Sequence, residues 1–245
     1  FFDDADVRAT RISSAGLDGM RFVLVTPSGS RPVAIPTPGR LSVHNALAGA
    51  AVGLAAGVPL GRIVAGLEGG WSAPHRAEIV RLRGMTVIDD SYNASPGSML
   101  AALEMLDDLP GRHVAVLGEM LELGEDGERG RLADGEAVGD RVGLLIVVGT
   151  AARGIVEGAI AAGLDPSRCH HVGDGDEALE VLRPRLRDGD TVLVKASRGI
   201  GLDRLVGSLR VELGEVGGVD EVDGAGRPTD SRDGGANGRS GESPR

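Results

Sequence analysis

Residues 85–106 read MTVIDDSYNASPGSMLAALEML, and this stretch contains the transition that decides the fold. Its first residues form a short apolar and β-branched run, which is typical of a buried strand. Acidic and hydroxyl side chains follow at once. Ser95 and Pro96 then open an apolar segment, and they favour a helix start because Ser is a preferred N-cap and Pro a preferred first helical residue. The stretch therefore predicts a strand, a polar turn and a helix over residues 97–106.

The same alternation continues on the carboxyl side of this stretch. Continuous apolar and β-branched runs alternate with helical patterns, which indicates a parallel sheet covered on both faces. We therefore predict a Rossmann-like α/β domain over residues 75–213, with ligands bound at the carboxyl ends of its strands. The further apolar runs are HVAVLG (113–118), LLIVVG (144–149) and TVLVKA (191–196), and the further helical stretches are 128–142, 151–162, 175–186 and 202–213.

The chain on either side of this domain has a different character. Residues 1–74 contain short strand patterns at 7–12, 21–26 and 31–35, then an Ala- and Gly-rich helix that Gly57 and Pro59 end, and a short helix over 60–66. This piece has the pattern of the back half of a second α/β domain. Residues 214–245 are rich in Gly, Asp, Arg and Ser and contain no Leu, Ile or Phe, so they predict a disordered tail.

Charge and composition narrow the classes of function. The chain has 26 basic and 36 acidic residues, and its net charge of −10 argues against nucleic acid or an anionic membrane as a partner. The longest uncharged run, residues 43–61, includes His44, Asn45 and Pro59 and predicts a buried helix and no membrane span. A single cysteine, Cys169, excludes an internal disulfide, and together with the lack of a signal peptide it predicts a cytoplasmic protein.

Polar side chains follow the first strand of the predicted sheet. Asp89 and Asp90 come directly after the apolar run, and Ser91, Tyr92 and Asn93 follow them. A carboxylate at a strand end suits ribose hydroxyls or a metal ion, and a tyrosine ring suits stacking on a base. The alternative is a polar turn that caps the next helix.

A second group of candidates follows the last strand, where residues 195–201 read KASRGIG. Two cations, a hydroxyl and glycines before a helix N-terminus predict an anion site that uses Lys195, Ser197 and Arg198. Lys195 is the only lysine of the chain, which suggests that this site needs a compact ammonium group. The alternative is that the lysine stands here by chance and has no functional role.

Two further candidates are weaker. Arg76 beside His75 suits a phosphate, with a solvent-facing arginine as the alternative. Cys169, His170 and His171 have metal-ligand chemistry, but on a strand only the first and third share a face and no second ligand pair follows, so we predict no metal site there.

The segments DDSYNASPGSM (89–99), LGEMLELG (117–124) and VLVKASRGIGLDRLV (192–206) together resemble three signatures of the Mur ligases. Upstream, PGRLSVHNALAGAAVG (38–53) resembles a helix of the family's central ATPase domain, with Asn45 matching its second Asn. The chain departs from the family pattern at five positions, which are Leu41, Ser42, Ser95, Arg131 and Ala196.

The resemblance implies an ATP-dependent amide ligase of peptidoglycan precursor synthesis. The matched signatures are those of the members that add D-alanyl-D-alanine to UDP-N-acetylmuramoyl-tripeptide. The resemblance also implies that Asp90 binds the ribose hydroxyls and that Arg76 binds the phosphates of the nucleotide. It implies further that Tyr92, Asn93 and Asn45 line the same nucleotide site. It also implies that Lys195 and Ser197 act in catalysis and, with Arg198, bind the dipeptide.

The resemblance covers the carboxy-terminal part of the family pattern. It implies ATP and Mg²⁺ as cofactors, with the phosphate loop and the main metal ligands outside residues 1–245, so we predict that this polypeptide alone is inactive. We predict a monomer. The alternative function is a non-catalytic module that binds a nucleotide or a peptide.

Overall fold

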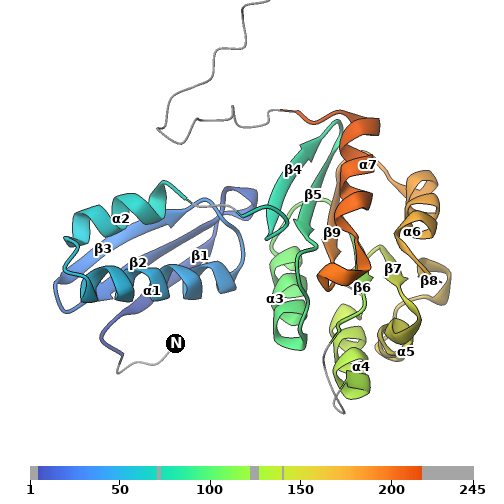
Figure 1. Ribbon diagram of the computed structural model, residues 1–245, viewed down its shortest axis with the longest axis horizontal. Helices are drawn as coiled ribbons and strands as arrows, with labels where there is room; N and C mark the ends of the chain where they lie inside the picture. The colour runs from blue at the N-terminus through green and yellow to red at the C-terminus, as the bar shows by residue number, and fades with distance from the viewer. Residues whose placement is uncertain (1–4, 71–72, 122–126, 140, 217–245) are drawn as a thin grey trace, which may run out of the picture.

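The computed structural model describes residues 5–70, 73–121, 127–139 and 141–216. They form two units that lie side by side, a smaller one built from the first three strands and two helices and a larger one built from the rest (Figure 1). Trp71 and part of the LGEMLELG segment lie outside the described residues, as does the predicted tail from residue 217 onward.

The smaller unit is an antiparallel sheet covered by two helices. Strands β1 (Arg8–Ser14), β2 (Met20–Thr26) and β3 (Gly29–Ile35) pair in sequence order, and helices α1 (Arg40–Ala55) and α2 (Leu60–Glu68) pack against them. The three predicted strands and both helices are confirmed. Apolar residues of the sheet meet Val43, Ala46 and Ala50 of α1 and Ile63 of α2 in one core. The unit thus has a core of its own.

The larger unit is a six-stranded sheet with the order β4-β5-β9-β6-β7-β8. All its neighbours are parallel except β4 and β5, which are antiparallel. The strands are β4 (Glu78–Leu82), β5 (Met85–Asp90), β6 (Arg112–Gly118), β7 (Leu144–Val148), β8 (Cys169–Val172) and β9 (Asp190–Lys195). The expected α/β sheet is confirmed in its parallel part, but the edge strand β4 makes the sheet mixed. The short Arg83-Gly84 connection explains this, because a two-residue hairpin joins only antiparallel strands.

Helices cover both faces of this sheet (Figure 1). Helices α3 (Pro96–Asp107), α4 (Gly127–Val138) and α5 (Arg153–Ala161) pack on one face, and α6 (Gly175–Leu182) and α7 (Asp203–Leu213) pack on the other. Side chains of β9 alternate between the two cores, with Leu193 in the first and Val192 and Val194 in the second. The same alternation determines which polar side chains at the strand ends lie on one face of the sheet and can contact each other.

The helix start predicted at Ser95 and Pro96 is confirmed. Ser95 and Ser98 form the capping interaction at the start of α3, with Pro96 in the first turn. Asp174 caps α6 by accepting hydrogen bonds from the backbone N–H groups of Asp176 and Glu177. Each cap satisfies donors that a helix start leaves unpaired.

The expected tail does not begin at Gly214. Glu215 bridges Leu82 of β4 in an antiparallel fashion, and the Val216 N–H donates to the Arg81 carbonyl at 2.7 Å. The exposed edge of β4 offers these backbone groups, so Glu215 and Val216 add a short pairing to it. In the described residues no helix is both long and apolar enough to cross a membrane.

The contact between α4 and α5 depends on two glycines that lie face to face. A Cβ atom at Gly158 would lie 2.2 Å from the Leu132 carbonyl oxygen, and one at Gly135 would lie 2.2 Å from the Ile155 carbonyl oxygen. We expect Gly158→Ala to lower the free energy of unfolding by about 1–3 kcal/mol, because backbone cannot move aside as a flexible side chain can. Urea denaturation measures this.

Gly207 of α7 is the matched control, since a Cβ there would meet nothing within 4 Å. Gly207→Ala should be neutral or stabilise by up to about 1 kcal/mol, because Ala favours helix over Gly. Equal effects of the two substitutions would contradict the proposed close packing of α4 on α5.

Candidate functional site

The centre of the site is an ion pair across the adjacent parallel strands β5 and β9. Asp90 and Lys195 are register partners at the carboxyl ends of these strands. The Lys195 Nζ lies 2.6 Å from the Asp90 Oδ2 and donates a second hydrogen bond to the Asn93 carbonyl at 2.9 Å. Lys195 is only 2% exposed. The predicted anion-binding ammonium is therefore already paired with a carboxylate.

The neighbouring aspartate, Asp89, has a different role because successive residues of a strand face opposite sides of the sheet. Its Oδ1 accepts hydrogen bonds from the Ser91 N–H at 3.1 Å and from the Ser91 hydroxyl at 2.6 Å. Its Oδ2 lies 2.7 Å from the His75 Nδ1. Asp89 is fully buried, so it orders the turn and the chain before β4.

His75, Glu78 and Asp89 come close enough together to resemble a metal centre. Their oxygens are already used, however, since Glu78 accepts from Arg210 at 2.5 Å and from the His75 N–H at 3.1 Å. Burial acts to raise the pKa of Glu78, but the hydrogen bonds from Arg210 and the His75 backbone outweigh it and lower that pKa. The cluster is a hydrogen-bonded support.

The loop that contains Arg76 is held in an uncommon backbone conformation. His75 has φ = 62° and Ala77 has φ = 49°, values that non-glycine residues rarely adopt. The Ala77 N–H donates to the Asp90 Oδ1 at 3.1 Å, and the Tyr92 N–H donates to the His75 carbonyl at 3.1 Å. These bonds offset the strain and place the Arg76 guanidinium 4.1 Å from the centroid of the Tyr92 ring.

A cavity of about 280 Å³ lies between the two units beside this ion pair. Five of the residues predicted from the sequence line it, with Asn45 from α1 and the others from the strand ends and the loop before β4. They are Asn45, Arg76, Asp90, Asn93 and Lys195. The cavity therefore brings together a helix of the smaller unit and the carboxyl ends of two strands of the larger one.

Three departures from the family pattern, Leu41, Ser42 and Ser95, also line this cavity. The Ser42 hydroxyl donates to the Thr37 carbonyl at 2.9 Å or to the Gly39 carbonyl at 2.6 Å, so it stabilises the start of α1. Leu41 is 47% exposed. Asn45 thus remains the amide of α1 that faces the cavity.

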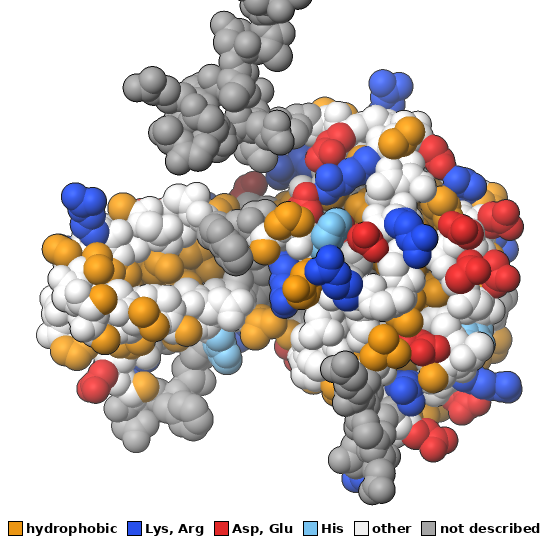
Figure 2. All heavy atoms as spheres, in the orientation of Figure 1, with side chains coloured by type: hydrophobic (Ala, Val, Ile, Leu, Met, Phe, Trp, Pro, Cys, Tyr) orange, Lys and Arg blue, Asp and Glu red, His pale blue; other side chains and the backbone are white. Residues whose placement is uncertain are grey.

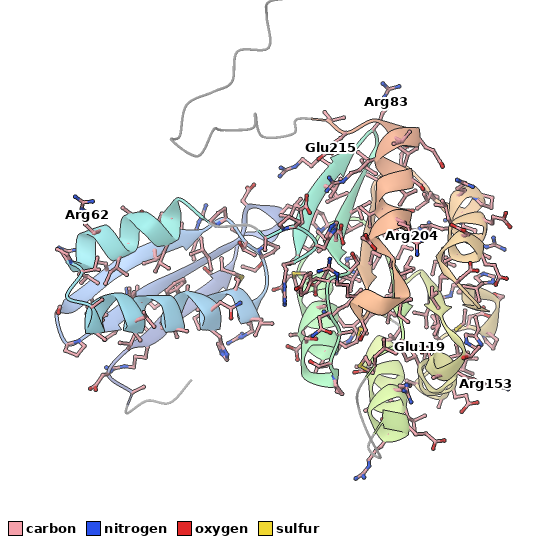
Figure 3. The ribbon with its side chains drawn as sticks, viewed as in Figure 1. Arg62, Arg83, Glu119, Arg153, Arg204 and Glu215 are labelled. Carbon is pink, nitrogen blue, oxygen red and sulfur yellow. The ribbon has the colours of Figure 1, made fainter. Side chains whose placement is uncertain are left out.

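A second cavity of about 270 Å³ lies on the other side of Tyr92. Its lining includes Arg198 and Arg204, with His75 and the acid Asp203. Arg204 lies in the first turn of α7 (Figure 3), and the Arg198 guanidinium carbon is 5.1 Å from the Tyr92 ring centroid. Basic side chains beside a histidine are visible at this edge of the larger unit in Figure 2.

Tyr92 and Arg198 were expected in different groups, one with the nucleotide and one with the dipeptide. The structure places both in the second cavity, while Asn93 and Lys195 lie in the first. Tyr92 separates the two, because Arg76 of the first cavity and Arg198 of the second both contact its ring.

Ser197 lines neither of these two cavities. It is buried, and its hydroxyl accepts a hydrogen bond from the Leu121 N–H at 3.0 Å while its own N–H donates to the Glu119 carbonyl. Glu119, labelled in Figure 3, accepts in turn from the Ala151 N–H at 2.7 Å. Ser197 therefore holds the residues after β6 in place.

The Cys169-His170-His171 stretch lies in β8, which ends at Val172. His171 Nε2 lies 2.8 Å from the Gly149 carbonyl oxygen. Burial raises the pKa of Cys169 and lowers that of His170. These side chains are part of the sheet edge.

Asp134 of α4 is a group that sequence reasoning missed. It is 3% exposed, and its Oδ2 has no hydrogen-bond partner among the described residues. Burial raises the pKa of Asp134 to about 7, although the positive charge of Lys195 acts to lower it. The only signal in the sequence was an acid at a position where the helix faces the sheet.

The raised pKa of Asp134 makes stability depend on pH. Between the ordinary value of 3.8 and about 7 the folded protein binds more protons than the unfolded chain, so stability falls as pH rises through this window and levels off above it. We expect Asp134→Asn to remove this loss, which amounts to about 1.4 kcal/mol for each pH unit at most. Thermal unfolding from pH 4 to pH 8 measures it.

Glu136→Gln is the matched control, because Glu136 is an exposed acid on the same helix. The control should keep the pH dependence of the unmodified chain. A pH dependence that persists in Asp134→Asn would contradict the assignment of the titrating group.

Comparison with known proteins agrees with this arrangement. Residues 75–198, half of the chain, match the family described as Mur ligase, glutamate ligase domain. UDP-N-acetylmuramoyl-tripeptide--D-alanyl-D-alanine ligase from Escherichia coli (strain K12) is 35% identical, over 84% of this chain and 45% of its own length. The ligase of the same name from Mycobacterium tuberculosis (strain ATCC 25618 / H37Rv) is 37% identical, over 83% of this chain and 44% of its own length.

A solved structure shows the same likeness. MurF from Acinetobacter baumannii superposes with a TM-score of 0.77 at 31% identity, covering 86% of this chain and 46% of that one. The chain spans about half the length of the relatives it matches. With the family domain matched over residues 75–198 and relatives at 35–37% identity over most of this chain, the chain belongs to the Mur ligase family.

Proposed function

We propose that this chain supplies part of the active site of an ATP-dependent ligase that adds D-alanyl-D-alanine to UDP-N-acetylmuramoyl-tripeptide. The observation that carries the proposal is the first cavity, where Asn45 of one unit faces Arg76, Asp90 and Lys195 of the other. Relatives that are 35% and 37% identical to this chain are named as ligases that catalyse this reaction. The chain covers about half of their length, so ATP and both peptide substrates belong to the proposal.

The charges of the first cavity suit a nucleotide. Asp90 lies at the end of β5, where its oxygens can accept hydrogen bonds from ribose hydroxyls. Lys195 neutralises the charge of this carboxylate, and Arg76 therefore leaves the wall with net positive charge toward phosphate groups. Asn45 and Asn93 add polar groups from two sides.

The same wall does not fit a divalent cation. In the described lining the one carboxylate is Asp90, and its two oxygens already accept from Lys195 and from the Ala77 N–H. Mg²⁺ prefers several free oxygen ligands. Its ligands in the proposed reaction are therefore to be sought outside the residues of this wall.

The proposed reaction has two steps. The γ-phosphoryl group of ATP passes to a carboxylate oxygen of the tripeptide, and ADP is the leaving group. The amine nitrogen of the dipeptide then attacks the acyl carbon, the bond from this carbon to the phosphate oxygen breaks, and the nitrogen releases a proton. The net positive charge that Arg76 leaves at the cavity favours the negative charge that develops on the phosphate.

The second cavity suits the carboxylate of the dipeptide. Arg198 and Arg204 contribute two guanidinium groups, and the N-terminus of the eleven-residue helix α7 adds its dipole. We therefore assign substrate binding to Arg198. Ser197 becomes a positioning residue, because its hydroxyl is bonded to the Leu121 N–H away from both cavities.

The acidic net charge of −10 supports a protein that does not bind nucleic acid. A cytoplasmic location and a monomeric state stay predictions from the sequence. The rival function, a non-catalytic module that binds a nucleotide or a peptide, shares the two cavities and differs in turnover alone.

The test grafts residues 75–213 onto an intact ligase of the family and measures phosphate release that depends on both peptide substrates. We expect Lys195→Met to lower kcat/KM by about ten- to a hundredfold, because it leaves the Asp90 carboxylate unpaired and removes a charge-assisted hydrogen bond of about 1.5–3 kcal/mol. Lys195→Arg should rescue only partly, since its planar fork is wider than an ammonium.

Arg153→Ala is the control, because Arg153 is an exposed cation far from both cavities that pairs only with Glu157 among the described residues (Figure 3). The graft with this control should keep full activity. Turnover by Lys195→Met within twofold of the unmodified graft would refute the role of Lys195. A folded graft that binds ATP without turnover would favour the non-catalytic module.

A further inference from the structure

Lys195 has more donors than the hydrogen bonds described for it. An ammonium has three N–H groups. Two of them are used, by the Asp90 Oδ2 at 2.6 Å and by the Asn93 carbonyl at 2.9 Å. No third hydrogen bond from Lys195 is present among the described residues. One direction around the ammonium is therefore open to another acceptor.

Asp134 offers such an acceptor on the same side of the sheet. Strand alternation places Lys195 on the face covered by α3, α4 and α5, because Leu193 two residues earlier belongs to that core. Asp134 belongs to α4, is buried, and keeps its Oδ2 without a partner in the described part of the chain. The charge of Lys195 acts on this carboxyl group.

We propose that Asp134 is a positioning residue that controls where the Lys195 ammonium lies. With the Asp134 carboxyl protonated, Lys195 stays on Asp90 and Asn93. When the carboxyl loses its proton, it attracts the ammonium toward α4 and leaves Asp90 freer to accept hydrogen bonds from a ligand in the first cavity. The proposal rests on the proposed function only for the identity of that ligand.

Besides Lys195, charged side chains lie on α4 itself and on the two helices that pack against it. Helices α3 and α5 pack against α4, and their acidic and basic side chains lie exposed at the surface, namely Glu104, Asp107, Arg153 and Glu157. On α4 itself Arg131 directs its Nη2 to the Met120 carbonyl at 3.4 Å, and its Nε is buried without a hydrogen-bond partner among the described residues. Burial and the charge of Lys195 are the causes that set the pKa of Asp134.

Proton release by Asp134 falls in an accessible range. Its raised pKa of about 7 means that the carboxyl changes charge between about pH 6 and pH 8, whereas an ordinary aspartate is ionised throughout that range. At about pH 6 the ammonium therefore has one carboxylate partner, Asp90, and at about pH 8 it has two, Asp90 and Asp134.

The single lysine makes the experiment direct. Labelling the full 245-residue chain with lysine carrying ¹³C at Cε yields one lysine resonance, from Lys195. We expect this resonance to shift in one step with a midpoint near pH 7 when the pH is raised from 5 to 9. The measurement needs no substrate, so its outcome is independent of the proposed ligase activity.

Asp134→Asn should abolish the step, whereas the control Glu136→Gln should retain it. All five histidines remain in Asp134→Asn, so a step that survives there would come from a histidine and would overturn the proposal. A flat titration of the unmodified chain would also overturn it. Asp134→Leu repeats the comparison without a polar group at this position, so the result does not depend on whether one variant folds.

Discussion

The ion pair between Asp90 and Lys195 lies where the adjacent parallel strands β5 and β9 of the larger unit end. It is largely removed from water, and a buried pair is strongly destabilised when one partner is lost because the other charge stays uncompensated. The same two side chains also anchor their surroundings. The Asn93 carbonyl is bound by Lys195, and the Ala77 N–H is bound by Asp90. The pair thus positions both the turn after β5 and the loop before β4.

That loop illustrates how a strained conformation is maintained at a site. His75 and Ala77 both have positive φ, and each is bonded to the end of β5 or to the turn that follows it. The result is a fixed position for Arg76 over the Tyr92 ring. Arginine on an aromatic face gains a favourable interaction that is larger when water is excluded. Tyr92 in this way connects the first cavity, through Arg76, with the second cavity beside α7, through Arg198.

Much of the fold follows from local signals in the sequence. Continuous apolar runs predicted four of the parallel strands, β5, β6, β7 and β9, because strands covered on both faces need apolar side chains in both directions. The parallel edge strand β8 was not among these runs. Ser95 and Pro96 predicted a helix start, since caps act within a few residues. The edge strand β4 was not predicted. Its sequence is half polar, and its antiparallel pairing depends on the hairpin at Gly84 and on the neighbouring β5.

The sequence by itself determined which residue types stand at the strand ends, and five of the predicted residues do line one cavity. Because Asp89 and Asp90 are successive residues of one strand, the sequence also determined that their side chains face opposite sides of the sheet. Only the tertiary structure decided that Lys195 is paired with Asp90, that Ser197 holds the chain after β6, and that Asp134 is buried behind the site. These outcomes depend on contacts between residues that are 60 or more positions apart in the chain, for example 105 for Asp90 and Lys195 and 76 for Leu121 and Ser197. Local patterns have no access to such contacts, because it is the packing of the sheet and its helices that brings these residues together.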